Sequence, residues 1–345
     1  MTPIDHLKKL DPEISRLLWA NDGKEASLSH IVQERRGISR QAANGLLSRM
    51  VLSGLLSEGA GKRPKTYNQP LLASLTKEYP IDTIEEHVVW VEDFRPGFAE
   101  FMGQSALQIW DYGFTEMLNN AIEHSQGTLV TVRAHVYPGG TACWIQDDGE
   151  GIFKRITRLC KLADERQAIL ELAKGKLTTD PENHTGEGVF FSSRAFDRFY
   201  ISAGGLVFDH TDGEDDYLFE REQSHPGTWV MMAHGNHTER VLKDVFDEFA
   251  EADEYTFSKT VVPVRLARMG AESLVSRSQA QRLLARVDRF KVVLFDFRDV
   301  ETIGQAFADE IFRVYAKGHP EVELLPIHAS VQVQQMISRA TAPRL

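Results

Sequence analysis

The chain carries a carboxylate and a carboxamide side chain at a spacing that could serve one reaction site. Glu116 and Asn120 lie four residues apart in the segment 111–125, DYGFTEMLNNAIEHS. Read as a helix at about 100° per residue, this segment directs Phe114 and Leu118 to one side and stacks Glu116 and Asn120 on the other. A carboxylate can take a proton from water or a hydroxyl, and an amide oxygen can ligate a hard cation such as Mg²⁺. An ordinary amphipathic helix with a solvated polar face shows the same pattern, so this segment alone leaves both interpretations open.

A second group of residues follows the β-hairpin that the sequence predicts after this helix. The runs TLVTVRAHVY and TACWIQD surround a Pro-Gly-Gly turn at 138–140. The second run ends at Asp147, where a carboxylate can accept a hydrogen bond from an adenine amino group. Gly149 and Gly151 come next, and their lack of a side chain lets the backbone approach a base closely. This DxGxG pattern is also common in ordinary turns.

Two further glycine motifs lie later in the chain. Gly186 and Gly188, in the run HTGEGVFFSSR, lead directly into a predicted helix, so free backbone N–H groups can face a phosphate there. Gly227 and Thr228 begin a β-rich run. The chain has no GKT or GKS sequence of the P-loop type, so a P-loop route to ATP is excluded.

Together these motifs resemble those of a known superfamily. ExxxNA stands at residues 116–121, DxGxG at 147–151, TGxG at 185–188 and Gly-Thr at 227–228. This order is similar to that of the GHKL ATPases, which include gyrase, chaperone, mismatch-repair and histidine-kinase ATPases. The similarity covers roughly residues 100–235, and the run NNAIEHS most resembles the anti-sigma-factor kinases. Each motif is weak alone, whereas the ordered set is specific.

The resemblance implies an α/β sandwich at residues 98–237 that binds ATP and Mg²⁺ under a mobile lid at about 153–184. It implies that Glu116 is the general base and that Asn120 ligates Mg²⁺ within the nucleotide site. The other contacts that it implies are adenine recognition by Asp147, a base pocket shaped by Gly149 and Gly151, phosphate binding by Thr185, Gly186 and Gly188, and a place near adenine for Thr228. Arg194, just inside the phosphate-side helix, could simply cap the fold. No phosphoacceptor-type helix hairpin precedes this segment, which argues against a sensor histidine kinase.

The composition fits a globular protein of several domains. At 345 residues, with 42% hydrophobic and 26% charged residues, the chain predicts two or three domains. Its two cysteines, Cys143 and Cys160, lack CxxC spacing, so neither a disulfide framework nor a structural zinc site is expected. No apolar run approaches the roughly 20 residues that span a bilayer, and the N-terminus lacks the apolar segment of a signal peptide. We therefore expect a cytoplasmic protein without a membrane partner.

The charge is distributed unevenly along the chain. Residues 1–80 contain 12 Lys or Arg against 8 Asp or Glu, whereas the remainder contains 27 against 42. The net charge of −11 therefore combines a basic N-terminal segment with an acidic body. Only the N-terminal segment suits a polyanionic partner.

The N-terminal 80 residues resemble a winged helix-turn-helix domain. The predicted second helix (LSHIVQERR) and third helix (RQAANGLLSRMVLSGLL) are joined by the short turn Gly37-Ile38, and a cationic stretch, SEGAGKRPKTYNQ, follows. The resemblance places base contacts at the start of the third helix, at Arg40, Gln41 and Asn44. It places phosphate contacts on the wing, at Lys62, Arg63 and Lys65. DNA is therefore the favoured partner. Winged helices also bind proteins, so a protein partner is the alternative.

The remaining segments predict connectors and a second α/β domain. Residues 81–97 read as a connector with one short strand, and residues 238–256 as an acidic linker helix. From 257 to 345 strands and helices alternate around the apolar strand KVVLFDF, which favours a small α/β layer domain. The run FDFRDVETIGQAFADEIF resembles STAS-like (DUF4325-type) domains and, distantly, the anti-sigma antagonists. Those antagonists carry a phosphorylatable Ser or Thr where this chain reads IGQA at 303–306, so an interaction or regulatory role is favoured over phosphorylation.

These features predict a multi-domain α/β protein with a winged helix-turn-helix, a GHKL α/β sandwich and a small STAS-like domain. We expect ATP binding, with slow hydrolysis, to switch the DNA-binding segment. We also expect a homodimer that contacts a protein partner through its STAS-like tail. Two alternatives stay open: a Ser/Thr protein kinase of the anti-sigma type acting on a partner, and a non-catalytic ATP-gated scaffold in stress or phage defence.

Overall fold

The chain divides into two compact units that interleave along the sequence. The structure, a computed structural model, describes residues 10–21, 27–62, 65–177, 186–214, 216–250, 257–268 and 273–342. The first unit comprises residues 1–148, 195–198 and 229–242, and the second comprises residues 149–194, 199–228 and 243–345. Neither unit coincides with one of the three predicted domains. Among the described helices, none is long and apolar enough to cross a membrane.

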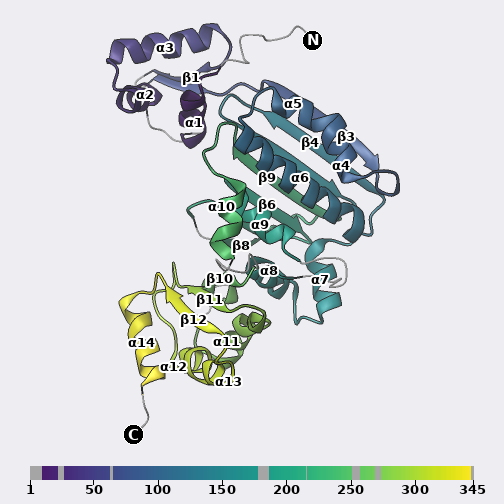
Figure 1. The fold of residues 1–345 in the computed structure, drawn as a ribbon, viewed down its shortest axis with the longest axis vertical. Helices are drawn as coiled ribbons and strands as arrows, with labels where there is room; N and C mark the ends of the chain where they lie inside the picture. The colour runs from purple at the N-terminus through teal and green to yellow at the C-terminus, as the bar shows by residue number, and fades with distance from the viewer. Residues whose placement is uncertain are drawn as a thin grey trace. The chain divides into compact units, whose positions relative to one another are not determined.

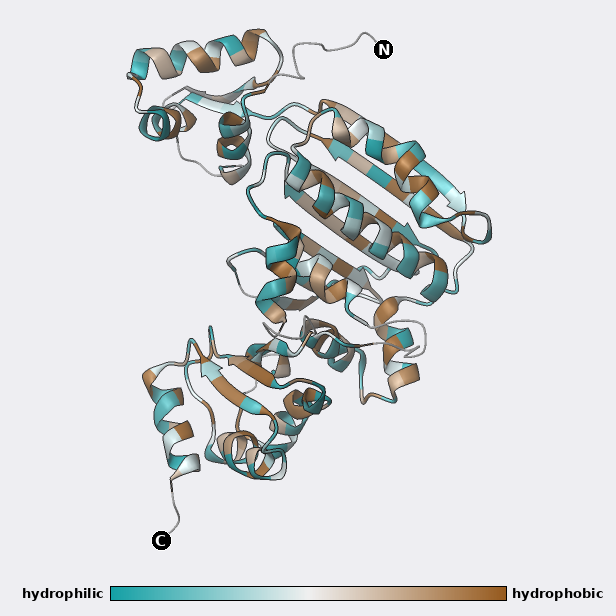
Figure 2. Cartoon of the chain, viewed as in Figure 1, coloured by the Kyte–Doolittle hydropathy of each residue, from teal (hydrophilic) through white to brown (hydrophobic). Residues whose placement is uncertain are grey.

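The first unit begins with three helices and a hairpin, in the order that the sequence predicts. They are α1 (Pro12–Ala20), α2 (Leu28–Arg36), α3 (Arg40–Leu52) and the antiparallel strands β1 (Ser57–Lys62) and β2 (Lys65–Asn68). The Asp11 carboxylate caps α1, the Ser39 hydroxyl caps α3, and Gly37 ends α2 with φ of 61°. Apolar and polar bands alternate along α3 (Figure 2). The apolar sides of the three helices and two leucines that follow α3 share one core: Ile14, Leu17, Leu18, Val32, Ala43, Leu47, Met50, Leu55 and Leu56.

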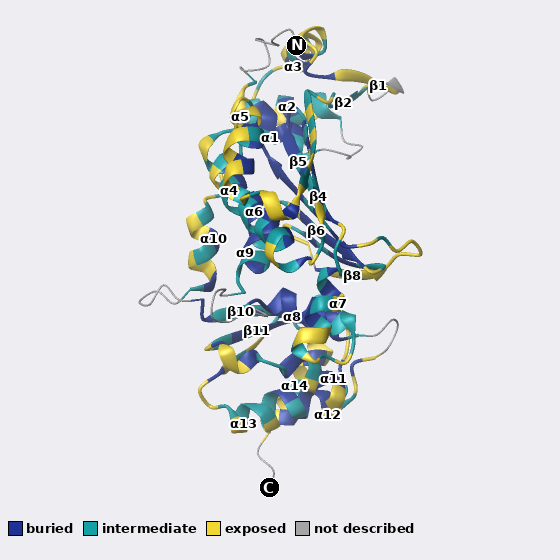
Figure 3. Ribbon diagram, turned by 90° about the vertical axis from the view of Figure 1, so that its right-hand side faces the viewer, coloured by how far each residue is buried: buried dark blue, intermediate teal, exposed yellow. Residues whose placement is uncertain are grey.

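Four neighbouring strands of a β-sheet also belong to the first unit. In spatial order they are β3 (Ala73–Pro80), β4 (Leu129–Val136), β5 (Gly140–Asp147) and β9 (Thr228–Gly235), all antiparallel to their neighbours. β4 and β5 form the predicted hairpin, and no residue of β5 is exposed (Figure 3). β3 falls inside the segment 1–80 that was assigned to the N-terminal domain, yet all of its residues pair with β4. The sheet therefore starts earlier in the chain than expected.

The segment between β3 and α6 is helical, which corrects the expectation of a short strand at residues 81–97. It contains η2 (Ile81–Thr83), α4 (Glu86–Val89), the π-helical turn η3 (Trp90–Phe94) and α5 (Arg95–Ala99), and it leads into α6 (Gln104–His124). Its β-branched residues suggested a strand, but Trp90, Phe94 and Phe98 recur every four residues and are all buried, which is helical behaviour. They pack against Phe114 and Trp110 of α6. Figures 1 and 3 show α4, α5 and α6 on the same face of the sheet.

Trp19, near the end of α1, attaches the three-helix segment to the sheet of the first unit. Its indole fills a socket made by glycines: a Cβ atom on Gly140 would lie 2.2 Å from the Trp19 ring, and one on Gly235 would lie 3.0 Å from it. The indole N–H donates to the Asp197 carboxylate at 2.7 Å. The Ser15 hydroxyl donates at 2.9 Å to a main-chain carbonyl in the turn between β4 and β5. The N-terminal helices are therefore docked onto this hairpin and are not held by the chain alone.

The second unit starts with α7 (Ile152–Cys160) and α8 (Glu165–Lys174), which fall in the segment expected to be a mobile lid. The side chains of α8 from 168 to 174 are buried, and α8 packs against β10 (Lys259–Pro263). The Lys174 ammonium donates to Glu171 and to the carbonyl of Ala285, both at 2.8 Å, and the Thr260 hydroxyl donates to the Lys174 carbonyl at 2.6 Å. A buried charge is stable only with such partners, and these contacts anchor α8 to β10 and to the end of α11. Residues 178–184 of the expected lid lie outside the described residues.

The rest of the second unit holds one helix with three strands, then a parallel sheet. The helix α9 (Gly188–Ala195) is followed by β6 (Arg198–Ala203), β7 (Leu206–Thr211) and β8 (Tyr217–Glu220), which are neighbours in that order. The parallel sheet has the order β10, β11 (Val292–Asp296) and β12 (Glu323–Ile327), so helical crossovers join its strands, as the alternating sequence pattern predicts. The helical elements of this C-terminal part are α10 (Leu242–Phe249), η4 (Val264–Ala267), α11 (Arg277–Leu284), η5 (Val287–Arg289), α12 (Gln305–Asp309), η6 (Glu310–Tyr315), α13 (Ala316–Gly318) and α14 (Val331–Thr341).

Candidate functional site

Helix α6 presents Glu116 and Asn120 on the side opposite its core contacts. Phe114 and Leu118 are fully buried, whereas Glu116 and Asn120 are half-buried. α6 packs against β5, whose last residue, Asp147, is only 4% exposed. The first unit therefore holds both the acid–amide pair of α6 and the carboxylate expected to accept the adenine amino group.

Asp148, next to Asp147, has a structural role that the sequence did not reveal. Its carboxylate accepts the backbone N–H groups of Leu129 at 3.0 Å and Thr128 at 2.6 Å, and the Thr128 hydroxyl at 2.7 Å. These hydrogen bonds, led by the one from Leu129, lower the pKa of Asp148. Asp148 thus ties the start of β4 to the end of β5. The two adjacent acids in the motif therefore have different tasks.

The second unit brings the DxGxG loop and the Gly-Thr motif together. Gly151 has φ of 88°, and a Cβ atom there would lie 3.3 Å from the carbonyl oxygen of Gly227. The Thr228 hydroxyl accepts the backbone N–H of Ile152, the first residue of α7, at 3.0 Å. Only glycine fits both the conformation and the close approach at position 151. Gly149 lies half-buried just before this junction.

The second glycine pair leads directly into α9. Gly186 has φ of 73°, a conformation that favours glycine, and Gly188 is the first residue of the helix. The N–H groups in the first turn of a helix lack intrahelical acceptors, so this end of α9 is suited to an anion. Thr185, which was also expected at the phosphates, lies outside the described residues.

The residues expected to contact DNA are only partly placed by the structure. Arg40, Gln41 and Asn44 are exposed at the start of α3, as base contacts require. Lys65 is exposed on β2, but its ammonium bonds to Glu58 of β1 at 2.5 Å, and this hydrogen bond raises the pKa of Lys65. Arg63 and the side chain of Lys62 lie outside the described residues. Of the three wing cations, the one described is thus already paired within the hairpin.

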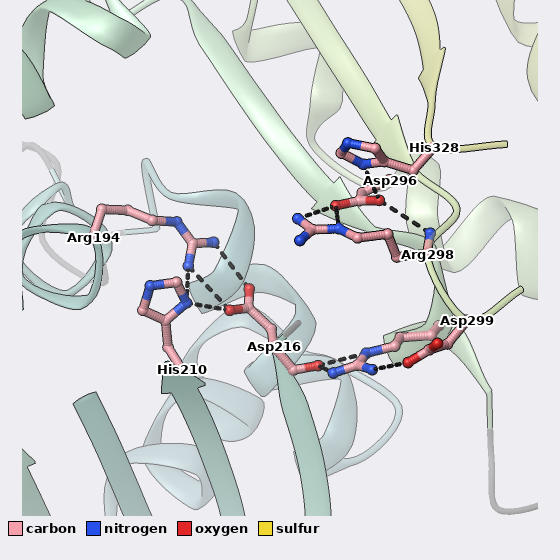
Figure 4. Close-up of polar contacts among 8 residues, drawn as sticks. Arg194, His210, Asp216, Asp296, Arg298, Asp299 and His328 are labelled. Carbon is pink, nitrogen blue, oxygen red and sulfur yellow. Dashed lines mark hydrogen bonds and ion pairs between the residues drawn. The ribbon is translucent and has the colours of Figure 1, made fainter. Parts of the chain in front are cut away.

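A cluster of charged side chains that the sequence did not single out lies in the second unit (Figure 4). The guanidinium of Arg194, in the last turn of α9, donates to both carboxylate oxygens of Asp216, at 3.0 and 2.9 Å. His210, near the end of β7, lies 2.5 Å from the same carboxylate. Asp216 and His210 are both buried. Arg194 therefore does more than cap α9, because it fixes the segment between β7 and β8 to this helix.

Burial and charge act in opposite directions on this cluster. Burial disfavours the ionised form of Asp216, but the charge of Arg194 and the hydrogen bond from His210 outweigh it and hold the pKa of Asp216 well below its usual range. Burial, reinforced by the charge of Arg194, lowers the pKa of His210. Near neutral pH the cluster is therefore an ionised Asp216–Arg194 pair beside a neutral imidazole.

The charged contacts continue at the carboxyl ends of β10 and β11. Arg265, just after β10, donates through Nε to the main-chain carbonyl of Asp216 at 2.6 Å and through Nη1 to Asp299 at 3.0 Å. Nearby, Asp296, the last residue of β11, accepts Arg298 Nη2 at 2.6 Å and contacts His328 at 2.9 Å. These two groups of contacts are drawn in Figure 4, and residues from both line a cavity of about 220 Å³.

The sequence carried a weak signal for this region. The run FDFRD places an acid and a base directly after a buried strand, which is where open α/β sheets present functional groups. Asp296 and Arg298 of this run bond to each other, whereas the other partners of the run, His328 and Arg265, lie more than 30 residues away in the chain, so only the structure shows that these charges meet. Among the described residues, no group of three or more His, Cys, Asp or Glu side chains is arranged to hold a metal ion.

Comparison with known families identifies one part of the chain. Residues 279–334 match the family model of a STAS-like domain of unknown function (DUF4325). The match begins in α11, includes β11 and β12, and ends in the first turn of α14. It supports the STAS-like interpretation of the C-terminal part and does not extend to residues 1–80 or 98–237. A comparison with curated proteins gave no match.

Proposed function

We propose that this chain is an ATP-operated regulator in which a GHKL-type ATPase segment controls a DNA-binding winged helix-turn-helix. The observation that carries the proposal is the placement of Asp147. It is a buried carboxylate at the end of β5, it lies in the same compact unit as Glu116 and Asn120, and it stands two residues before Gly149. A carboxylate accepts hydrogen bonds, and the adenine amino group is a donor whose hydrogen bond Asp147 can accept.

Each motif has a distinct role in this proposal. Glu116 is the general base toward the attacking water, and Asn120 ligates Mg²⁺ through its amide oxygen. Asp147 selects adenine. The base pocket and the phosphate contacts come from glycines and hydroxyls: Gly149, Gly151 and Thr228 for the base, and Thr185, Gly186 and Gly188 for the phosphates. When bound, ATP with Mg²⁺ supplies the phosphoryl group that water attacks. The oxygen donors of α6 fit a hard cation, which supports Mg²⁺ over softer metals.

The first unit supports DNA as a partner. α3 begins after the short turn that follows α2. It exposes Arg40, Gln41 and Asn44, whose side chains have the hydrogen-bonding groups that read base edges in the major groove. The docking of Trp19 supports coupling, because it makes α3 and β5 parts of one compact unit. A nucleotide that contacts Asp147 therefore acts on the same body that carries the DNA-reading helix.

The STAS-like segment is the proposed contact for a protein partner. The family match supports a STAS-like domain here, and the exposed Thr302 precedes the buried Ile303, outside the position where a phosphoacceptor is expected. We expect the chain to act as a homodimer, since a two-fold protein suits a palindromic DNA site.

The test is a DNA titration with the full chain, with and without a non-hydrolysable ATP analogue, on the promoter fragment of its own operon. If ATP and DNA binding share one equilibrium, the analogue changes the DNA affinity about 5- to 150-fold, and DNA changes the analogue's affinity by the same factor. Equal DNA affinity with and without the analogue would mean that nucleotide binding does not control the winged helix. The protein-kinase or scaffold alternative would then take the lead.

A further inference from the structure

We infer that Arg265 is a positioning residue through which the STAS-like segment sets the nucleotide affinity of α9. The inference rests on the proposed function, since it takes the glycine end of α9 as a phosphate contact. It concerns only residues of the second unit, and it assigns the regulation of that site to a specific side chain.

The first step is the bond between α9 and the segment before β8. Arg194 binds Asp216 with two parallel N–H···O contacts, and its guanidinium also lies 5.3 Å from the centre of the Phe190 ring of the same helix. Paired, buried and bidentate contacts of this kind are directional and costly to break. Asp216 and α9 therefore move as one piece.

The second step is the bond between Asp216 and Arg265. Arg265 directs Nε and Nη2 to the main-chain carbonyl of Asp216, and its guanidinium stacks 3.8 Å from the centre of the Tyr217 ring. The Arg265 side chain is 11% exposed, so these contacts are largely shielded from water. The third guanidinium nitrogen of Arg265, Nη1, donates to Asp299, in the turn after β11. Asp299 lies within the segment that matches the STAS-like family, and it has φ of 55°.

The third step is the geometry of α9 itself. This helix has eight residues, which corresponds to about 12 Å at 1.5 Å per residue. Arg194 lies in its last turn and Gly188 is its first residue, so the helix itself connects Arg194 to the proposed phosphate contact at Gly188. Aromatic contacts hold its sides: the Phe190 ring lies edge-to-face with Phe249 at 4.9 Å and tilted against Phe257 at 4.7 Å between ring centres. A shift of Asp299 that moves Arg265 is thereby passed through Asp216 and Arg194 to the glycine end of α9.

The consequence is a specific form of regulation. A partner that binds the STAS-like segment and displaces the turn at Asp299 would loosen or reposition α9 and change the affinity for ATP. By linkage, ATP would change the affinity for that partner by the same factor. The contiguous contacts alone do not measure this coupling, so the experiment must compare variants in the complete chain.

The test compares Arg265→Lys with Arg298→Lys in the full chain. Both substitutions keep the charge and remove a guanidinium fork. Arg298 lines the same cavity but bonds to Asp296 of its own domain, and its side chain is 40% exposed, which makes it the matched control. Two quantities are measured: hydrogen exchange of amides 188–195 without nucleotide, and the Kd for ATP with Mg²⁺ by calorimetry. We expect Arg265→Lys to speed exchange in α9 and to weaken ATP binding about 5- to 150-fold, and Arg298→Lys to change neither.

The outcomes separate this inference from the proposed function. Faster exchange in α9 with an unchanged Kd for ATP, or equal effects of the two substitutions, overturns the inference. Wild-type chain that fails to bind ATP overturns the proposed function instead, and the exchange data then still show whether Arg265 holds α9. Should Arg265→Lys fold poorly, Asp299→Asn removes the last contact of the series without touching the buried Asp216, and the same two measurements apply.

Discussion

The indole N–H of Trp19 and the carboxylate of Asp197 are joined by a hydrogen bond of 2.7 Å. The same carboxylate oxygen also accepts the backbone N–H of Gly235 at 2.9 Å and lies 2.9 Å from Nδ1 of His234. One acid thus holds α1, β9 and the segment after α9 together within the first unit. The docking of the N-terminal helices depends on this acid and on the glycine socket beside it.

The glycine socket gives the first prediction. Gly140→Ala should lower the thermal unfolding midpoint, because the new Cβ atom would lie 2.2 Å from the Trp19 ring and force it out of place. Overpacking of this kind costs about 1–3 kcal/mol. Gly97→Ala is the control: nothing lies within 4 Å of a Cβ there, and Gly97 is in the helix α5, where Ala is favoured by up to ~1 kcal/mol. If calorimetric scans show a lower unfolding midpoint for Gly97→Ala than for Gly140→Ala, the Trp19 socket does not contribute to stability as proposed.

The second prediction concerns pH and Asp197. Burial opposes its ionisation, but the hydrogen bond from His234, the charges of His234 and Arg240 and the N–H of Gly235 outweigh burial and hold its pKa at about 2 instead of 3.8. A depressed carboxyl pKa stabilises the fold above pH 3.8, and this contribution is lost as the pH falls from 3.8 toward 2. Its size is about 2 kcal/mol. Urea unfolding of wild type and Asp197→Asn should therefore differ by that amount at pH 6 and converge near pH 2; a difference independent of pH contradicts the assignment.

The third prediction tests nucleotide recognition with two adjacent acids. Asp147→Asn should weaken ATP binding by about 1–3 kcal/mol, because the adenine amino group loses a charged acceptor. Asp148→Asn should leave the Kd for ATP near the wild-type value and lower the unfolding midpoint, because Asp148 holds the N–H groups at the start of β4. Isothermal titration and thermal scans on both variants provide the data. The reversed pattern would mean that Asp148, and not Asp147, faces the nucleotide.

The fourth prediction addresses catalysis. Glu116→Ala should leave ATP bound and lower the turnover about 10²–10⁴-fold, because it removes the general base and not the phosphate contacts. Glu123→Ala, two turns further along α6 at an exposed position, is the matched control and should keep wild-type turnover. Phosphate release is measured under saturating ATP. Unchanged turnover in Glu116→Ala would show that the base lies elsewhere or that the activity is a contaminant.

The fifth prediction follows from the Lys65–Glu58 pair. Glu58→Gln should strengthen DNA binding and steepen its dependence on salt by about one unit of the log–log slope, because Lys65 becomes available to a phosphate. The double variant Glu58→Gln/Lys65→Gln should lose this gain. Arg40→Ala should instead relax the sequence preference with little change in the slope. Salt titrations on specific and scrambled DNA distinguish these effects, and identical slopes for all variants would exclude a wing contact at Lys65.

Local periodicity explains what the sequence could predict. The apolar spacing of α6 and the continuous apolar run of β11 each indicate one element, and the structure contains both, although α6 begins at Gln104, before the predicted segment 111–125. The connector at 81–97 was misread because its valines favour strands, whereas its aromatic residues recur at helical spacing and find a shared core on α6. There the tertiary contact decided the local structure.

Long-range pairing explains what the sequence could not predict. Trp19 and its glycine socket, or Arg194 and Asp216, show no common spacing or motif, because their partners are chosen by the folded arrangement. The burial of Lys174 belongs to the same class: a Lys in an ordinary helix is normally solvated, and here Glu171 of the same helix and the carbonyls of a distant segment together stabilise the buried ammonium. Likewise, two adjacent aspartates look equivalent in sequence and differ only in what surrounds them.

The separation of Trp19 from Asp197 has a consequence for the timing of synthesis. The two residues are 178 positions apart, and chains grow at roughly 5–20 residues per second, so the acceptor leaves the ribosome roughly 9–36 seconds after the indole. The buried residues of the N-terminal core lie between residues 14 and 56, so this core can assemble during that interval. Contact with Asp197 is therefore a late event, and a chain that stops before residue 197 would keep the hairpin of β4 and β5 but lack the acceptor for the Trp19 indole and the Gly235 side of its socket.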